Sequence, residues 1–142
     1  MTKGAANNIR VLDFSWGMAG PLTAMLLASA GAEVIKIESQ QRIDMSRISA
    51  DPYTGKPTGI NKNSIFNDLN RNKLSANINL KHPRGLELIK SLIKISDVVI
   101  ENYSAGVMER LGLGYKVVSE LNPSIVMSSS STMGGTGPEV GA

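Results

Sequence analysis

Two short polar segments carry residue types that bind phosphate groups. Residues 70–73 read NRNK, and residues 101–110 include Asn102 and Tyr103 near their start and Arg110 at their end. Arginine offers a planar fork of donors to an anionic oxygen and also stacks on planar rings, whereas lysine offers a compact charge. Both segments are therefore candidates for binding a phosphate-bearing ligand. The alternatives are a solvated turn for the first segment and an ordinary exposed helix arginine in the second.

Two glycine-bearing segments could present backbone N–H groups to an anion. Residues 15–20 read SWGMAG, and residues 128–137 read SSSSTMGGTG. A dinucleotide site needs G-x-G-x-x-G after the first strand and an acid at the end of the second. Glu38 stands in the acidic position, but the third glycine is missing and Pro21 follows the turn directly. An NAD-linked domain is thus one alternative, and a tight strand-to-helix turn is the other.

The residue types that are rare or absent exclude several kinds of catalytic and metal site. The chain has no cysteine, which excludes disulfides, thiolate metal sites and a cysteine nucleophile. Its one histidine, His82, precedes Pro83 and is predicted to lie at a helix cap rather than to act as a base. No base stands near the serines at 128–131, and no carboxylate cluster or metal-ligand spacing occurs, so we expect no metal.

Basic residues are concentrated in the middle of the chain. The segment from Arg42 to Arg84 carries a net charge of about +5, which exceeds the net charge of +3 of the whole chain. Both a polyanionic ligand and a solvated positive loop fit this excess. Aromatic residues make up 4% of the chain and no basic helix carries an aromatic stripe, so nucleic acid is not an expected partner. Without a long apolar run or a signal peptide, a soluble, cytoplasmic protein with no membrane partner is expected.

Hydrophobic periodicity predicts the elements that position these segments. Residues 9–14 read as a strand, Pro21 suits the start of a helix that ends before Gly31, and residues 34–37 read as a second strand. Further strands are predicted at residues 75–80, 97–100 and 125–128, and further helices at 83–93, 107–111 and 117–121.

The alternation of strands and helices predicts an α/β fold. We expect one Rossmann-like domain over residues 1–142, with a mainly parallel sheet, helices on both faces and a long basic loop region at 39–69. Ligands of such sheets bind beyond the carboxyl ends of the strands. The segments placed there are residues 15–20, 38–41, 102–106 and 129–135.

Three long segments together resemble the family III CoA-transferases, which include formyl-CoA, carnitine and bile-acid CoA-transferases and α-methylacyl-CoA racemase. The segments are RVLDFSWGMAGPLTAMLLASAGAEVIKIE, LNRNKLSANINLKHPRGLELIKSLIKISDVVIENYSAGVMERLGLGY and LNPSIVMSSSSTMGGTGP. The resemblance implies a coenzyme A (CoA) site and no NAD. It implies contacts to CoA and the acyl thioester from Met18 and Ala19, and contacts to the nucleotide end from Asn72, Lys73, Asn102, Tyr103 and Arg110.

This sequence departs from the family pattern at two places. Many members carry a basic residue after the second strand, where this chain has Ser39 and Gln40. The usual S-G-F-G after the last strand is here residues 131–134, STMG. In the family a nucleophilic aspartate follows the GTGP segment, and its carboxylate attacks the acyl-CoA thioester to give a mixed anhydride and then an enzyme-bound CoA thioester. Racemases of the family place a histidine and an aspartate in the same downstream region.

Three hypotheses follow from the resemblance and the residues. The first is an N-terminal portion or subunit of a CoA-transferase that uses acyl-CoA and carboxylic acid substrates, with the catalytic aspartate downstream and no catalytic residue within this chain. Part of a racemase-like enzyme is a variant of it. The second is a non-catalytic CoA-binding or interaction protein, and the third is an NAD-linked domain. The interlocked dimers of the family imply a homo-oligomer or a complementing C-terminal chain.

Overall fold

A single five-stranded parallel sheet forms the centre of the computed structural model, which describes residues 4–132, 134–138 and 140. The strands are β1 (Arg10–Asp13), β2 (Glu33–Glu38), β3 (Lys73–Asn77), β4 (Val98–Glu101) and β5 (Val126–Ser129). Their order across the sheet is β3-β2-β1-β4-β5, and every neighbouring pair is parallel. This confirms the predicted α/β fold with a parallel sheet.

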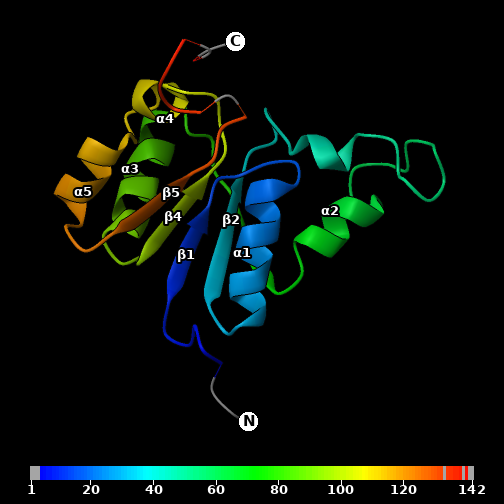
Figure 1. Ribbon diagram of the computed structural model, residues 1–142, viewed down its shortest axis with the longest axis horizontal. Coiled ribbons are helices and arrows are strands. Elements are labelled where there is room, and N and C mark those ends of the chain that lie inside the picture. The colour runs from blue at the N-terminus through cyan, green and yellow to red at the C-terminus, as the bar shows by residue number, and fades with distance from the viewer. Residues whose placement is uncertain (1–3, 133, 139, 141–142) are drawn as a thin grey trace.

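Helices cover both faces of this sheet (Figure 1). On one face, α1 (Ala19–Ser29) packs its alanines 24 and 28 against Val11 and Val34. On the other face, α3 (Pro83–Ile93) and α5 (Tyr115–Leu121) pack against the strands together with α4 (Val107–Arg110). Because successive strand residues point to opposite faces, one strand such as β1 supplies both cores.

The two long helices differ in how their apolar residues are distributed. In α3, Ile89 and Ile93 are fully buried while the opposite side is polar, which is the usual amphipathic pattern. The α3 start is capped as the sequence predicted, since His82 Nδ1 accepts the N–H of Arg84 at 3.3 Å. By contrast, the polar side chains of α1 are only Thr23 and Ser29, and the helix leaves Leu22 and Leu26 exposed.

The segment 39–69 contains two short helical elements that the sequence analysis did not assign. These are the 3₁₀ turn η1 (Met45–Arg47) and the helix α2 (Ser64–Leu69). Asn63 begins α2, because its Oδ1 accepts the N–H groups of Ile65 and Phe66. The predicted loop is therefore partly helical, and the Asn63 cap with apolar residues three apart was the signal for it.

β3 also differs from its predicted range of 75–80. It begins two residues earlier at Lys73 and ends at Asn77, while Ile78 N donates to Glu38 O at 2.7 Å just beyond it. The alternation that suggested a strand to residue 80 continues in the connection to α3, where Ile78 is buried in the core. No helix in the described part of the chain is long and apolar enough to cross a membrane.

Candidate CoA site

The candidate site lies where the strand order reverses, between β1 and β4. In open parallel sheets this reversal opens a crevice beyond the carboxyl ends of the two strands. Trp16 follows β1 and Asn102 follows β4, and the two residues pair closely. Asn102 Nδ2 donates to Trp16 O and Asn102 Oδ1 accepts from Trp16 N, both at 2.7 Å. The sequence prediction that these two segments meet at one edge is confirmed.

Aromatic rings and an arginine lie together at the carboxyl ends of β1 and β4. The rings of Trp16 and Tyr103 meet edge to face, with centroids 5.3 Å apart and planes at 82°. The guanidinium carbon of Arg42 lies 4.7 Å from the Trp16 ring centroid, a distance suited to cation–π attraction. Burial, and then the charge of Glu101, raise the pKa of Tyr103, so its phenol stays neutral. The cluster offers planar surfaces beside a positive charge.

Lys73 lies inside the protein rather than at its surface. Its ammonium donates to Asp13 Oδ2 at 2.8 Å, to Pro21 O at 2.9 Å and to Asn70 Oδ1 at 2.9 Å. An ammonium has three protons, so these acceptors occupy all of them. Burial lowers the pKa of Lys73 and the Asp13 carboxylate opposes that shift. In this arrangement Lys73 ties β3 to β1 and to α1.

The other predicted site residues lie at exposed positions. Met18 and Ala19 continue from the Trp16 turn into the start of α1, and Met18 is 63% exposed. Arg110 is exposed at the end of α4, and its Nη1 lies beside Gly106 in the loop that follows Tyr103. Asn72 is exposed, with a φ of 60°, in the turn before β3. The described residues therefore bring Met18, Asn102 and Tyr103 to one edge, with Arg110 against the same loop.

A sequence model of CoA-transferase family III matches residues 7–142. The chain belongs to this family. An acyl-CoA transferase of Fusarium pseudograminearum is 41% identical, over 96% of this chain and 31% of the relative. The succinyl-CoA:glutarate CoA-transferase of Homo sapiens is 37% identical, over 92% of this chain and 28% of the relative. The chain thus spans about a third of the length of these relatives.

Solved structures are similar over nearly the whole chain. The orthorhombic form of Rv3272 from Mycobacterium tuberculosis matches with a TM-score of 0.86 at 31% identity, covering 99% of this chain and 38% of that one. A CAIB/BAIF family protein from Brucella suis matches with a TM-score of 0.85 at 29% identity, covering 98% of this chain and 36% of that one. The resemblance noted in the sequence is therefore confirmed at the level of family and fold.

In this family III CoA-transferase chain, Glu38 is engaged by the scaffold. Its Oε1 and Oε2 accept from Arg47 at 2.7 and 3.1 Å, and its side chain is 8% exposed. Arg47 also lies 3.5 Å from the Phe66 ring centroid, so Glu38 fastens the segment after β2 to α2. The acid that suggested an NAD ribose contact is used instead to position this segment.

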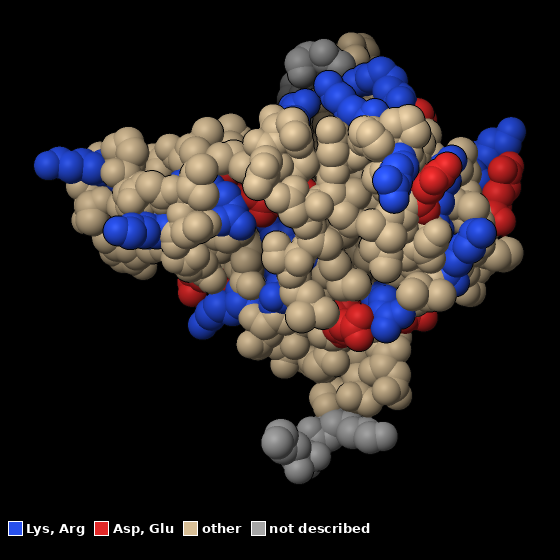
Figure 2. All heavy atoms as spheres, turned by 180° about the vertical axis from the view of Figure 1, so that it is seen from behind, with Lys and Arg blue, Asp and Glu red and all other residues tan. Residues whose placement is uncertain are grey.

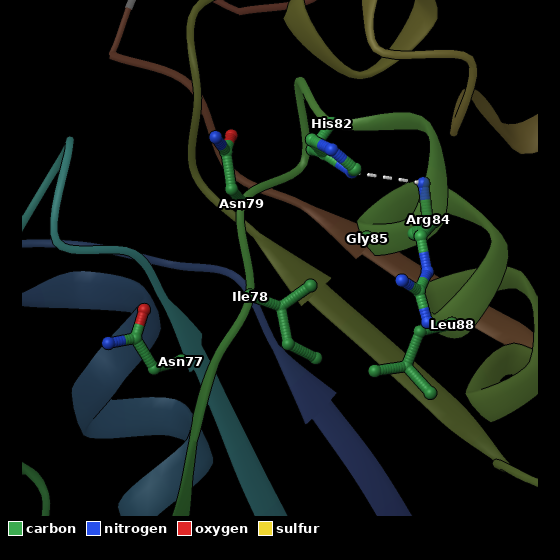
Figure 3. A pocket seen from close by; sticks show the side chains of 7 residues that line it. All are labelled: Asn77, Ile78, Asn79, His82, Arg84, Gly85 and Leu88. Carbon is green, nitrogen blue, oxygen red and sulfur yellow. Dashed lines mark hydrogen bonds between the residues drawn. The ribbon is translucent and has the colours of Figure 1, made fainter.

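A hollow of about 400 Å³ lies beyond β3, beside the start of α3 (Figure 3). Its lining residues are Asn77, Ile78, Asn79, His82, Arg84, Gly85 and Leu88. None of the seven predicted CoA contacts lines it, and His82 is occupied as the cap of α3. The candidate site is therefore assigned to the carboxyl ends of β1 and β4, where Trp16, Asn102 and Tyr103 meet, rather than to this hollow.

Positive side chains occur at the carboxyl edge of the sheet and elsewhere on the surface. Figure 2 shows Lys and Arg spheres at the upper edge, toward which the strands point in Figure 1, and also along both sides of this face. Among residues 4–132, 134–138 and 140, no group of three or more His, Cys, Asp or Glu could hold a metal ion.

Within the 131–134 segment, Met133 lies outside the described residues.

The sequence analysis assigns no position to Trp16 or Arg42 at the candidate site. Trp16 lies within the glycine-bearing segment 15–20, and its large amphipathic ring was the available signal for a contact there. Arg42 enters the sequence analysis only as one of the basic residues between Arg42 and Arg84. Its contact with Trp16 depends on how the segment after β2 folds back, which includes the bridge between Ser39 and Arg42.

Proposed function

We propose that this chain is the CoA-binding N-terminal portion of a family III CoA-transferase, which moves CoA between an acyl-CoA and a carboxylic acid. The nucleophilic aspartate is supplied downstream of residue 142. The observation that carries the proposal is the Asn102–Trp16 junction at the reversal of strand order, with Arg42 and Tyr103 on the Trp16 ring. The single-domain organisation over 1–142 and a cytoplasmic location remain parts of this proposal.

The chemistry of CoA supports this placement. Its nucleotide end combines a planar base with phosphates, and the ends of β1 and β4 combine aromatic rings with the cation Arg42, while Arg110 lies beside Gly106 in the loop after Tyr103. Its pantetheine arm is long and only weakly polar, and Met18 and Ala19 offer an apolar start of α1 beside the same turn. Asn72 stays a proposed nucleotide contact from the turn before β3. Lys73 is proposed to support the site through Asp13.

Replacing Arg110 with alanine tests the site directly. In isothermal titration calorimetry the unaltered chain is expected to bind CoA saturably, more tightly than dephospho-CoA, and not to bind NADH. Arg110→Ala should raise the Kd for CoA by about tenfold or more, because a charge-assisted bond to phosphate is lost. Arg110 has its charged end exposed, so this change should leave folding intact.

The matched control is Lys94→Ala, which removes one positive charge at the far end of α3. Equal losses of CoA affinity in both variants would mean that net charge, and not Arg110, is responsible. A folded chain with no measurable CoA binding would contradict the proposed function.

We also propose that α1 packs against a second copy of the chain or against a complementing C-terminal chain. Met18, Leu22 and Leu26 are spaced by four along α1, and they are 63%, 42% and 58% exposed. Residues at this spacing lie on one helix face, and a helix with so few polar side chains is normally covered. Contiguous exposed apolar surface of this kind marks an interaction site.

Leu26→Glu is expected to prevent this association. Sedimentation velocity should show the unaltered chain self-associating as concentration rises, and the variant sedimenting as a monomer, because a carboxylate would be buried without a partner. Leu88→Glu on α3 is the control, since Leu88 is 50% exposed on a helix whose outer side is polar. A monodisperse unaltered monomer at high concentration would exclude a second copy as the partner of α1, and failure of a complementing C-terminal chain to bind that monomer would then contradict the α1 interface.

A further inference from the structure

A buried ion pair contacts the turn after β1 that belongs to the candidate site. Lys36 Nζ of β2 lies 3.0 Å from Asp44 Oδ2, and the two side chains are 3% and 0% exposed. Burying two charges costs several kcal/mol per ion, at an order of magnitude, and such pairs are often replaceable by apolar residues without loss of stability. A contribution to the stability of the fold is therefore a weak explanation for burying this pair.

Both partners of the pair also bind the backbone of the turn after β1. Lys36 Nζ donates to Ser15 O at 2.8 Å, and Asp44 Oδ1 accepts the N–H of Gly17 at 3.0 Å. Trp16, between them, has both backbone groups bound by Asn102. Side chains from β2, from the segment after β2 and from the end of β4 thus hold consecutive peptide groups of one turn.

Asp44 also fixes the segment that carries Arg42. Its Oδ1 accepts the N–H and the hydroxyl of Ser46 at 2.9 and 2.7 Å, which begins the η1 turn. Its own N–H donates to Glu38 Oε1 at 3.2 Å. One carboxylate therefore connects the Trp16 turn to the segment whose arginine lies on the Trp16 ring.

The charge of Asp44 is maintained in this buried position. Burial alone would raise its pKa, but Lys36, Ser46 and the Gly17 N–H outweigh burial and lower the pKa below its ordinary value. A carboxylate that stays ionised keeps accepting from several donors, and preorganised charge-assisted bonds hold a site in one geometry.

A second ion pair, which joins β1 to β2, offers a comparison. Arg10 and Glu33 pair at 2.7 Å at the first residues of β1 and β2, the ends of the strands away from the candidate site, with side chains 33% and 46% exposed. That pair holds no turn of the candidate site, and an exposed pair contributes little to stability. The Lys36–Asp44 pair differs in being buried and in binding the turn on both sides.

We propose that Lys36 and Asp44 are positioning residues of the CoA site, which fix the Ser15–Gly17 turn so that Trp16 and Met18 are presented in a single geometry. This inference rests on the proposed CoA-binding function for its effect on affinity. Neither residue is placed in contact with CoA. A preorganised turn should raise affinity because less conformational freedom is lost on binding.

The test uses a double variant that removes both charges, Lys36→Met with Asp44→Leu. Removing both avoids an unpaired buried charge, while the N–H groups of Gly17 and Ser46 lose their acceptor, so circular dichroism first establishes that the variant folds. Trp16 is the only tryptophan of the chain, so its fluorescence reports the turn directly. We expect a shifted Trp16 emission, stronger quenching by acrylamide, and a Kd for CoA raised about tenfold through lost preorganisation. Glu33→Ala, which breaks the exposed pair, should change neither readout.

A folded double variant with unchanged Trp16 emission and unchanged CoA affinity would overturn the inference. If Trp16 responds in the variant but the unaltered chain does not bind CoA, the proposed function fails and the positioning of the turn stands. Amide exchange in the unaltered chain supplies a measurement that needs no variant. The N–H groups of Trp16 and Gly17 should exchange as slowly as that of Leu12 in β1, and exchange at loop rates would contradict the inference.

Discussion

Replacing Lys73 with methionine is expected to lower the free energy of unfolding by about 3–5 kcal/mol, because it leaves the buried carboxylate of Asp13 without a charged partner. Asp13 is fully buried, and its Oδ2 accepts from Lys73 at 2.8 Å. The same ammonium also binds Pro21 O and Asn70 Oδ1, so three segments lose a shared donor. Urea unfolding followed by circular dichroism measures the change.

The double variant Asp13→Asn with Lys73→Met is the control. The asparagine keeps an acceptor for the N–H of Ser15, which donates to Asp13 Oδ1 at 3.0 Å, and it removes the unpaired charge. Most of the lost stability should return in the double variant, giving a large coupling energy in the double-mutant cycle. A loss below about 1 kcal/mol in the single variant would mean that water or another donor replaces Lys73.

The same double variant also separates two roles for Lys73. The family resemblance predicts a contact with the nucleotide end of CoA, whereas the geometry gives Lys73 three internal acceptors. If Lys73 only supports the fold, a stable double variant should bind CoA with nearly unchanged affinity. If Lys73 reaches CoA when it is bound, affinity should fall although stability is restored.

Much of the fold could be predicted because its signals are local. The apolar run before residue 15, the proline at the start of α1 and the glycine at 31 each act within a few residues, and they predicted β1, α1 and β2. The parallel order then brings strand ends together, so the meeting of the segments 15–20 and 102–106 at one edge followed from general rules of open sheets, although the Trp16–Asn102 pairing itself did not.

The remaining features depend on contacts between residues far apart in the chain. Lys73 belongs to a polar NRNK turn that resembles a solvated phosphate loop, yet its side chain reaches Asp13, sixty positions away. Likewise, nothing in the local pattern pairs Lys36 with Asp44, or sets Arg42 on Trp16. The partner of a long side chain depends on which groups the fold brings near it. Spacing along the sequence therefore does not reveal whether a cation contacts a ligand or a buried acid.

Replacing Gly20 with alanine is expected to disturb the site through sterics alone. Gly20 lies in the first turn of α1, and a Cβ there would overlap the Cβ of Ser15 and lie 3.4 Å from Cγ of Asn102. Ser15 belongs to the turn that carries Trp16, and Asn102 binds the Trp16 backbone, so relief of the overlap must move this turn. We expect a loss of about 1–3 kcal/mol of stability, typical of overpacking, although alanine favours helices over glycine.

Gly135→Ala is the matched control for this substitution, because no atom lies within 4 Å of the added methyl group. Calorimetry and Trp16 fluorescence should both distinguish the two variants. Gly20→Ala should shift the Trp16 emission and weaken CoA binding by about tenfold or more, in line with the cost of small displacements in a binding site. If Gly20→Ala folds and binds CoA like the control, helix α1 can move away from Ser15 without affecting the site. Close packing of α1 on the turn would then be a feature of the scaffold alone, and the positioning of Trp16 would depend on the polar contacts of Asn102, Lys36 and Asp44.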